Sequence, residues 1–191
     1  MPYPHSISTY LRERQPPAVR FFHIAILFLV LSQILVSNFM EFTNSGEISR
    51  NFIEYYATWI HIISGLTLIP LSLIFVAIEL KRHGLRYFLP YLYGEFSQLK
   101  DDLQTLLRLN LPDANAYGIA AIIQGLGLGA LLLVALSGSA WFLSWLYVPT
   151  WAHNLKEVHE TLTGLIEAYA IGHGGMGVLH LFFYLKNKTG H

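Results

Sequence analysis

Four long, nearly continuous apolar segments constrain this chain more than any other feature. They cover about residues 18–40, 55–80, 117–146 and 155–185. Each is at least as long as the roughly 20 residues that a helix needs to cross the hydrocarbon core of a bilayer. Because lipid offers the backbone no hydrogen-bond partner, apolar runs of this length are expected to span as helices. The sequence therefore predicts an all-α membrane protein, a bundle of four transmembrane helices forming a single domain over residues 1–191.

Charged residues are scarce and unevenly placed. Only 13% of the residues are charged, whereas a soluble domain has about a quarter of its residues charged. Of the 12 lysines and arginines, only Arg50 and Lys156 fall in the two predicted outer loops, near residues 41–54 and 147–156. Positive charge concentrates on the cytoplasmic side of membrane proteins. Both termini and the central connection are therefore predicted to be cytoplasmic, because they hold Arg12, Arg14, Arg20, Lys81, Arg82, Arg86, Lys100, Arg108, Lys186 and Lys188.

The connection between the second and third spans is predicted to contain an amphipathic helix on the cytoplasmic side. Apolar residues recur there at helical spacing and polar residues fill the other face. The apolar set is Leu92, Phe96, Leu99, Leu103, Leu106 and Leu107, and the polar set is Glu95, Lys100, Asp101, Asp102 and Arg108. This pattern is typical of a helix lying at the membrane surface. The alternative is a cytoplasmic extension of the second span.

The chain contains no cysteine. This excludes disulfides, iron–sulfur clusters, zinc sites built on thiolates and covalently attached c-type haem. Any metal must therefore be held by histidine, methionine or oxygen ligands. There are nine histidines and only three methionines.

Five of the nine histidines lie inside predicted spans, where an ionisable residue is costly and, taken alone, is either a ligand or a partner in a helix–helix hydrogen bond. His159 and His173 lie within about 40° of one helix face and about 21 Å apart along its axis. His61 matches the depth of His159, and His23 approximately matches that of His173. Imidazole is a good iron ligand, and four-helix bundles hold cofactors between facing helices. The pattern favours two b-type haems, each held by two histidines, one near each membrane surface.

The fifth histidine, His180, leaves a second interpretation open. It lies on the same helix face as His173 and nearer the cytoplasm, so by depth it competes with His173 as the partner of His23. Its rival role is a polar or proton-carrying group at a quinone pocket. Candidates to hydrogen-bond the ligand imidazoles are Ser64, Thr58, Thr163 and Tyr169.

Polar residues elsewhere are interpreted more simply. His5, His83, His153 and His191 lie outside the spans or at their ends and are expected to be solvated. Glu167 lies in the middle of the fourth span, where an acid is costly without a partner or a proton. A proton relay and a neutral, hydrogen-bonded structural acid are both consistent with that position.

The fourth segment, LKEVHETLTGLIEAYAIGHGGMGVLH, resembles the fourth helix of prokaryotic cytochrome b561. The segments RFFHIAILFLVL and WIHIISGL look like the other ligand helices of that family, and DANAYGIAAIIQGLG resembles the cytochrome b subunits of respiratory formate dehydrogenase and nickel–iron hydrogenase. These groups share one four-helix core, so the resemblance covers nearly the whole chain. It implies two haem b groups, a bacterial inner membrane, and a homodimer as a common state.

The resemblance also implies residue roles. It implies that His61 and His159 bind the outer haem iron, and that His23 and His173 bind the cytoplasmic one, which favours His173 over His180. It implies a quinone site near the cytoplasmic haem, where Asn115 matches a quinone-site position of the dehydrogenase subunits and Gly118 is a weaker match.

The leading functional hypothesis is a dihaem cytochrome that carries electrons across the membrane between an extracytoplasmic redox protein and quinone. One alternative is a self-contained superoxide:quinone oxidoreductase of the cytochrome b561 type. A basic outer funnel would favour superoxide, but Glu41, Glu47 and Glu54 offset Arg50 in the first outer loop. A second alternative is a membrane anchor without haem. Lipid, quinone and a redox protein are the implied partners, and no nucleic acid is implied.

Overall fold

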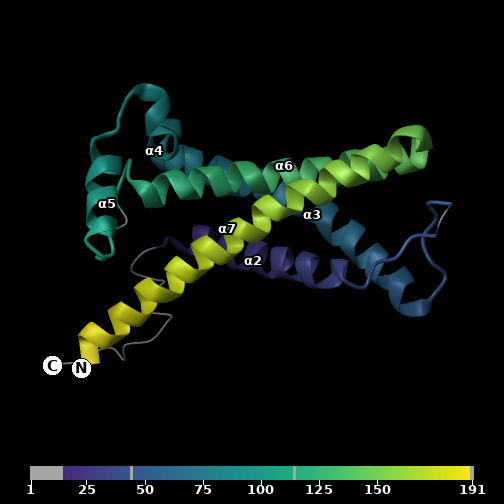
Figure 1. Ribbon diagram of the computed structural model, residues 1–191, viewed down its shortest axis with the longest axis horizontal. Helices are drawn as coiled ribbons and strands as arrows, with labels where there is room; N and C mark the ends of the chain where they lie inside the picture. Colours follow the sequence, from purple (N-terminus) through teal and green to yellow (C-terminus); the bar gives the residue numbers. More distant parts are fainter. Residues whose placement is uncertain (1–14, 44, 114, 190–191) are drawn as a thin grey trace.

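The computed structural model describes residues 15–43, 45–113 and 115–189, and its elements are helices. They are α2 (Pro17–Ser37), α3 (Phe52–His83), α4 (Leu85–Phe88), the 3-10 helix η1 (Pro90–Tyr93), α5 (Ser97–Leu107), α6 (Ile119–Tyr147) and α7 (Pro149–Thr189) (Figure 1). In the described ranges the only strand-like pairing is a bridge between Phe42 and Ile48. His5, Arg12, Arg14 and His191 of the sequence analysis lie outside the described residues.

Three of the described helices, α2, α3 and α6, are long and apolar enough to cross a membrane. Their bounds agree with the first three predicted spans, so the prediction of an all-α membrane protein is confirmed. The 41-residue α7 is longer than any of them but is not among the three. It carries Lys156, Glu157, Glu160 and Glu167 within its first half. The fourth span therefore stays a prediction.

Local signals explain where α3 begins and ends. The side chain of Asn51 accepts a hydrogen bond from the backbone N–H of Ile53 at 3.0 Å, which caps the start of the helix. At the other end Gly84 has φ +74°, a conformation that favours glycine and stops the helix. The alternative of a cytoplasmic extension running on through the central connection is therefore wrong: α3 stops at His83, and a separate helix, α5, follows.

The second outer loop is shorter than the sequence predicts. A loop was expected near residues 147–156, but α6 ends at Tyr147 and α7 begins at Pro149, so that only Val148 lies between them. Ser144 holds this corner, because its hydroxyl donates to the carbonyl of Val148 at 2.9 Å. Pro149 begins the next helix, since its fixed φ suits the first helical position.

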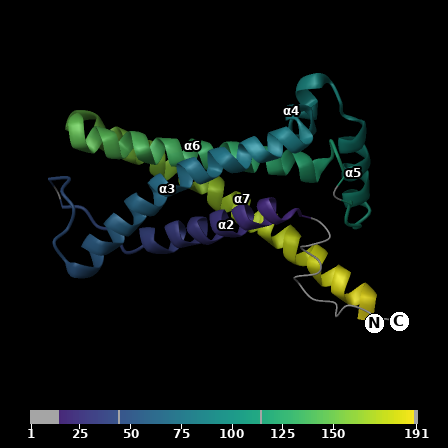
Figure 2. The ribbon, with the colours of Figure 1, turned by 180° about the vertical axis from the view of Figure 1, so that it is seen from behind.

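The four long helices pack around a small apolar core. Ile26 and Val30 of α2, Leu68 of α3, Leu131 of α6 and Ile166 of α7 are buried against one another. The start of α2, the end of α3, the start of α6 and the end of α7 lie toward the same end of the molecule, together with α4 and α5 (Figures 1 and 2). By the distribution of lysine and arginine, this is the end that we expect to face the cytoplasm.

The short helix α5 is attached to the start of α6. Asp102 is 3% exposed, and its carboxylate accepts hydrogen bonds from the backbone N–H of Ile119 at 2.8 Å and from Gln98 at 2.7 Å. Asp102 thus caps α6 from another helix. Gly118 lies directly beneath it, and a Cβ at this position would overlap the carboxylate. The predicted helix between the second and third spans is present, with Leu103 and Leu107 exposed.

This contact predicts a cost for a side chain at residue 118. Gly118→Ala should lower the free energy of unfolding by about 1–3 kcal/mol, because the new methyl group displaces Asp102 and leaves a buried carboxylate without its partner. Thermal unfolding of the detergent-solubilised protein measures this. The matched control is Gly129→Ala on the same helix, where a Cβ would meet nothing within 4 Å. Equal stability of the two variants would contradict the proposed cap.

Candidate functional site

One pair of histidines faces across the bundle near the end that we expect to face away from the cytoplasm, called here the outer end. His61 of α3 and His159 of α7 have ring centroids 6.3 Å apart, with their planes at 76°. In the described part of the chain no hydrogen bond joins the two rings. Nδ1 of His159 lies 3.0 Å from the hydroxyl of Ser137 on α6. Nδ1 of His61 is buried and has no hydrogen-bond partner among the described residues.

A cavity of about 330 Å³ contains this outer pair. Its wall is mainly apolar, with Gln33, Glu160 and Glu167 among the few polar residues that line it. This volume falls in the range of small-molecule and cofactor sites. Gly138 forms part of the wall, and a Cβ there would lie 2.8 Å from Cε1 of His159. Glycine therefore keeps open the space in which the His159 ring lies.

A second pair lies near the opposite end. His23 of α2 and His173 of α7 have ring centroids 6.1 Å apart, at 67°. The ring of Tyr169 stacks on His173, with centroids 4.9 Å apart and planes at 9°. The ring of Phe75 lies parallel to His23 at 6.4 Å. Aromatic rings therefore restrict the orientation of both imidazoles.

The spacing of both pairs fits one metal ion between two imidazoles. A metal–nitrogen bond of about 2.0–2.1 Å plus the distance from that nitrogen to the ring centre places two opposed imidazole centroids about 6.3 Å apart. The observed separations are 6.3 and 6.1 Å. At the outer pair the unsatisfied Nδ1 of His61 and the cavity beside Gly138 fit a bound group as well. The residues present therefore fit a haem held through iron by two histidines.

The remaining predicted site residues lie apart from these pairs. Nδ1 of His180 is buried without a hydrogen-bond partner in the described ranges, and no described contact joins His180 to His23. Asn115 is exposed in the loop before α6, and its carbonyl accepts a hydrogen bond from Gly118 at 3.3 Å. The place of Gly118 beneath Asp102 gives this glycine a structural role that the sequence analysis did not foresee.

Two of the polar neighbours of the histidines were missed. Of the four predicted candidates, Tyr169 contacts an imidazole, whereas the hydroxyls of Thr58, Ser64 and Thr163 donate to carbonyls of their own helices. The missed residues are Ser137, beside His159, and Gln15, whose Nε2 lies 3.3 Å from Nδ1 of His23. Ser137 is itself a polar residue within the third apolar segment, and this could have marked it as a partner for a buried histidine.

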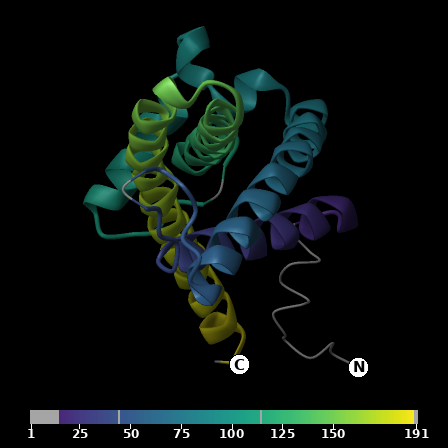
Figure 3. The same cartoon turned by 90° about the vertical axis from the view of Figure 1, so that its right-hand side faces the viewer.

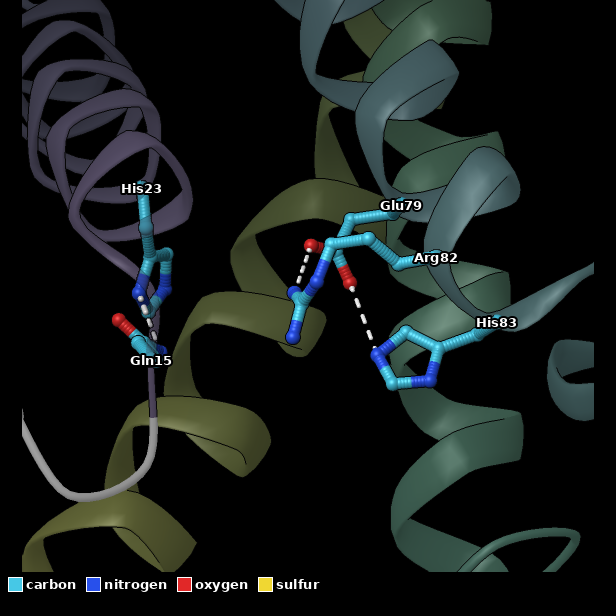
Figure 4. A network of polar contacts seen from close by, with 5 residues as sticks. All are labelled: Gln15, His23, Glu79, Arg82 and His83. Atoms are coloured by element: carbon cyan, nitrogen blue, oxygen red, sulfur yellow. Dashed lines mark hydrogen bonds and ion pairs between the residues drawn. The ribbon is translucent and has the colours of Figure 1, made fainter.

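A polar cluster lies at the C-terminal end of α3, the end that we expect to face the cytoplasm (Figure 4). Glu79 is buried, its carboxylate pairs with Arg82 at 2.7 Å, and Nε2 of His83 lies 3.8 Å away. His83 was predicted to be solvated, and it is exposed in the structure, with its side chain also facing this carboxylate. Nearby, burial and then the negative charge of Glu79 raise the pKa of Tyr87. On the surface, Arg86 lowers the pKa of Glu95 by a hydrogen bond.

The family model described as prokaryotic cytochrome b561 matches residues 14–188. The chain belongs to the prokaryotic cytochrome b561 family. No curated protein and no solved structure matches it. The suspected family is thus confirmed, and it makes this chain a membrane b-type cytochrome of electron transfer, multi-pass in a bacterial membrane. Membership also implies haem b, which argues against the alternative of an anchor without haem.

The close fit at Gly138 generates a prediction for this cytochrome b561. Gly138→Val should remove at least half of the bound haem, because the added side chain occupies the space of His159 and part of the cavity. The pyridine haemochrome assay on folded, detergent-purified protein measures haem per chain. Gly129→Val is the matched control on the same helix, where a Cβ meets nothing within 4 Å. Haem loss in both variants would mean that the effect is not specific to His159.

Proposed function

We propose that this cytochrome holds two b haems and carries electrons across the bacterial inner membrane between an extracytoplasmic redox protein and quinone. His61 and His159 hold the outer haem, and His23 and His173 hold the inner one. The chain forms a single domain over residues 1–191 with four spans and both termini in the cytoplasm.

One observation carries the proposal: two imidazole pairs, each with the spacing for a single metal ion, share the helix α7. Their centroid separations are 6.3 and 6.1 Å. On α7 the two histidines lie about 21 Å apart along the axis. This arrangement gives two redox sites at different depths in one bundle. It supports His173 over His180 as the inner ligand, because His173 faces His23.

The haems supply one-electron redox chemistry, and the protein sets their position and surroundings. Ser137 bonds to Nδ1 of His159 and so directs Nε2 of that ring toward His61. Gln15 makes the corresponding contact at Nδ1 of His23. Between the two levels lies the apolar core around Leu68 and Leu131, which excludes water from the middle of the path.

The path of α7 supports a fourth span. This helix leaves the tight turn at Val148 and returns beside α6 in the opposite direction (Figures 1 and 3). Its charges are accommodated: Lys156 pairs with Glu160 at 3.2 Å near the outer end. Glu167, in the middle of the helix, lines the cavity instead of packing in the apolar core. A helix that runs antiparallel to a membrane-spanning neighbour and is at least as long is expected to cross the same bilayer.

The outer surface favours a protein partner over superoxide. A small anion is attracted by a funnel of unpaired positive charge. Lys156 is the lysine that lines the outer cavity. Its ammonium group pairs with Glu160 and lies 5.1 Å from the centroid of the Phe42 ring. Glu41, Glu47 and Glu54 lie in or beside the first outer loop, which also carries Phe42. A superoxide:quinone oxidoreductase would need the opposite balance of charge.

The resemblance of the loop around Asn115 to the dehydrogenase subunits supports a quinone site on the cytoplasmic side. That loop is attached to the inner end of the bundle, because the ring of Tyr117 lies 6.3 Å from the ring of Tyr87. Tyr117 also has φ +64°, an uncommon conformation for a residue other than glycine. Strained residues concentrate at binding sites, which supports a site here.

The proposal predicts haem stoichiometry and ligand identity. The purified wild type should contain about two b haems per chain. His159→Ala and His173→Ala should each lose about one haem, since an iron with a single histidine is bound weakly. His180→Ala should lose none. Reduced-minus-oxidised spectra combined with the pyridine haemochrome assay measure these values.

His153→Ala is the matched control for His159, because His153 is 80% exposed and pairs only with Glu157 in the described part of the chain. Loss of haem in His180→Ala with retention in His173→Ala would move the inner site toward the cytoplasm. A wild type with one haem would refute the dihaem assignment.

A further inference from the structure

A buried acid lies at the cytoplasmic end of α3, close to the inner histidine pair. Glu79 is only 8% exposed. It follows Phe75 by about one helical turn, and Phe75 lies parallel to the ring of His23. The carboxylate therefore lies on the side of α3 that faces the inner pair and one turn nearer the cytoplasm. The negative end of the helix dipole disfavours an acid near the C-terminus of a helix, so helix stability does not explain why Glu79 is at this position.

The two oxygens of this carboxylate face different partners (Figure 4). Oε1 accepts a hydrogen bond from the guanidinium of Arg82 at 2.7 Å. Oε2 faces Nε2 of His83 at 3.8 Å, a gap that a small side-chain movement or one bridging water closes. Arg82 holds the carboxylate in place through Oε1. Oε2 of Glu79 stays directed toward His83, which can carry a proton.

His83 connects this buried acid to the surface and to the loop proposed for quinone. Its side chain is 32% exposed, so it reaches water. Its ring stacks on Tyr87 with centroids 4.4 Å apart, and Tyr87 lies beside Tyr117, two residues from Asn115. Glu79 thus lies between the inner histidine pair and the segment that carries Asn115.

We propose that Glu79 and His83 form the proton route between the cytoplasm and a quinone bound near the His23–His173 pair. The inference rests on the proposed function. Reduction of one quinone to quinol takes two electrons, which arrive through the inner redox site, and two protons. Each proton passes from water to His83, then to Oε2 of Glu79, and then to a quinone oxygen. Quinol oxidation runs the same steps in reverse and releases two protons to the cytoplasm.

The charges around Glu79 suit this exchange. On α3 itself the neighbours are Lys81, Arg82 and His83, and the titratable groups on the packed helices are His23 on α2 and Tyr87 on α4. On this side α2 also carries Arg20, α7 carries His173, His180, Tyr184 and Lys186, and the cytoplasmic half of α6 carries no charged residue. The other acids at this end include Glu95, which pairs with Arg86, and Asp102, which accepts from Ile119 and Gln98. In the described part of the chain Glu79 is therefore the acid of the four long helices at this level, and basic groups lie on the helices around it.

The experiment measures haem reduction by a water-soluble quinol in the purified, haem-loaded protein across a pH series. Glu79→Gln should slow this reduction at least about tenfold and flatten its pH dependence, because the amide cannot accept the quinol proton. Reduction of the same variant by dithionite should be unchanged, since it needs no quinone. Small weak acids added to Glu79→Gln should restore part of the rate.

Glu95→Gln is the matched control, because Glu95 is an acid on the same side whose partner is Arg86 on the surface. Quinol should reduce the haem of this variant at the wild-type rate. If Glu79→Gln loses haem, His83→Gln carries the test, with an expected slowing of a few-fold and the same flattened pH profile. Wild-type rates and pH profiles in folded Glu79→Gln and His83→Gln would overturn the proton route. A wild type that dithionite reduces and quinol does not would instead overturn the proposed quinone reaction.

Discussion

The rest of the structure depends on the opposition of two imidazoles at each of two levels along α7. His159 faces His61, and His173 faces His23, at centroid distances that differ by only 0.2 Å, the difference between 6.3 and 6.1 Å. Keeping both distances requires α2 and α3 to lie at the right distance from a single long helix. Two glycines let α6 approach α7 closely, Gly138 beside His159 and Gly127 beside Tyr169. This close packing keeps α7 at the required distance. A bulkier residue at either glycine would push α6 away from α7.

Polar groups inside an apolar bundle are costly, and here their cost is offset locally. Ser137 satisfies one nitrogen of His159, and Gln33 donates to the carbonyl of His61 at 3.1 Å. At the C-terminal end of α3, Arg82 neutralises Glu79. Among the described residues the buried polar atoms without a hydrogen-bond partner are Nδ1 of His61, Nδ1 of His180, Nε1 of Trp59, Oγ of Ser72 and Oε1 of Gln15. Of these residues, His61 lines the cavity that we assign to the outer haem.

Much of the fold follows from patterns that depend on neighbours in the chain. The apolar segments predicted α2, α3 and α6, and the spacing of Leu99 and Leu103 predicted the helix that became α5. The matched depths of the histidines predicted that His61 faces His159, but at the inner end they left His173 and His180 open as the partner of His23, and only the family resemblance favoured His173. The tight turn at Val148 was missed because a single proline can begin a helix within polar sequence. The contacts of Asp102 with α6 and of His83 with Glu79 were missed because each depends on how helices or side chains pack, which residue spacing does not specify.

By itself the sequence determined the class of the protein, the depth of each histidine and the absence of thiol chemistry, because hydropathy and helical periodicity are local properties. Only the tertiary structure decided which neighbours complete each site. It selected Ser137 for His159 and Gln15 for His23, placed Gly118 beneath Asp102, and brought Tyr87 beside Tyr117. The physical reason is that a helix fixes the spacing of its own residues, whereas its rotation and separation relative to another helix are set by side-chain packing over the whole interface.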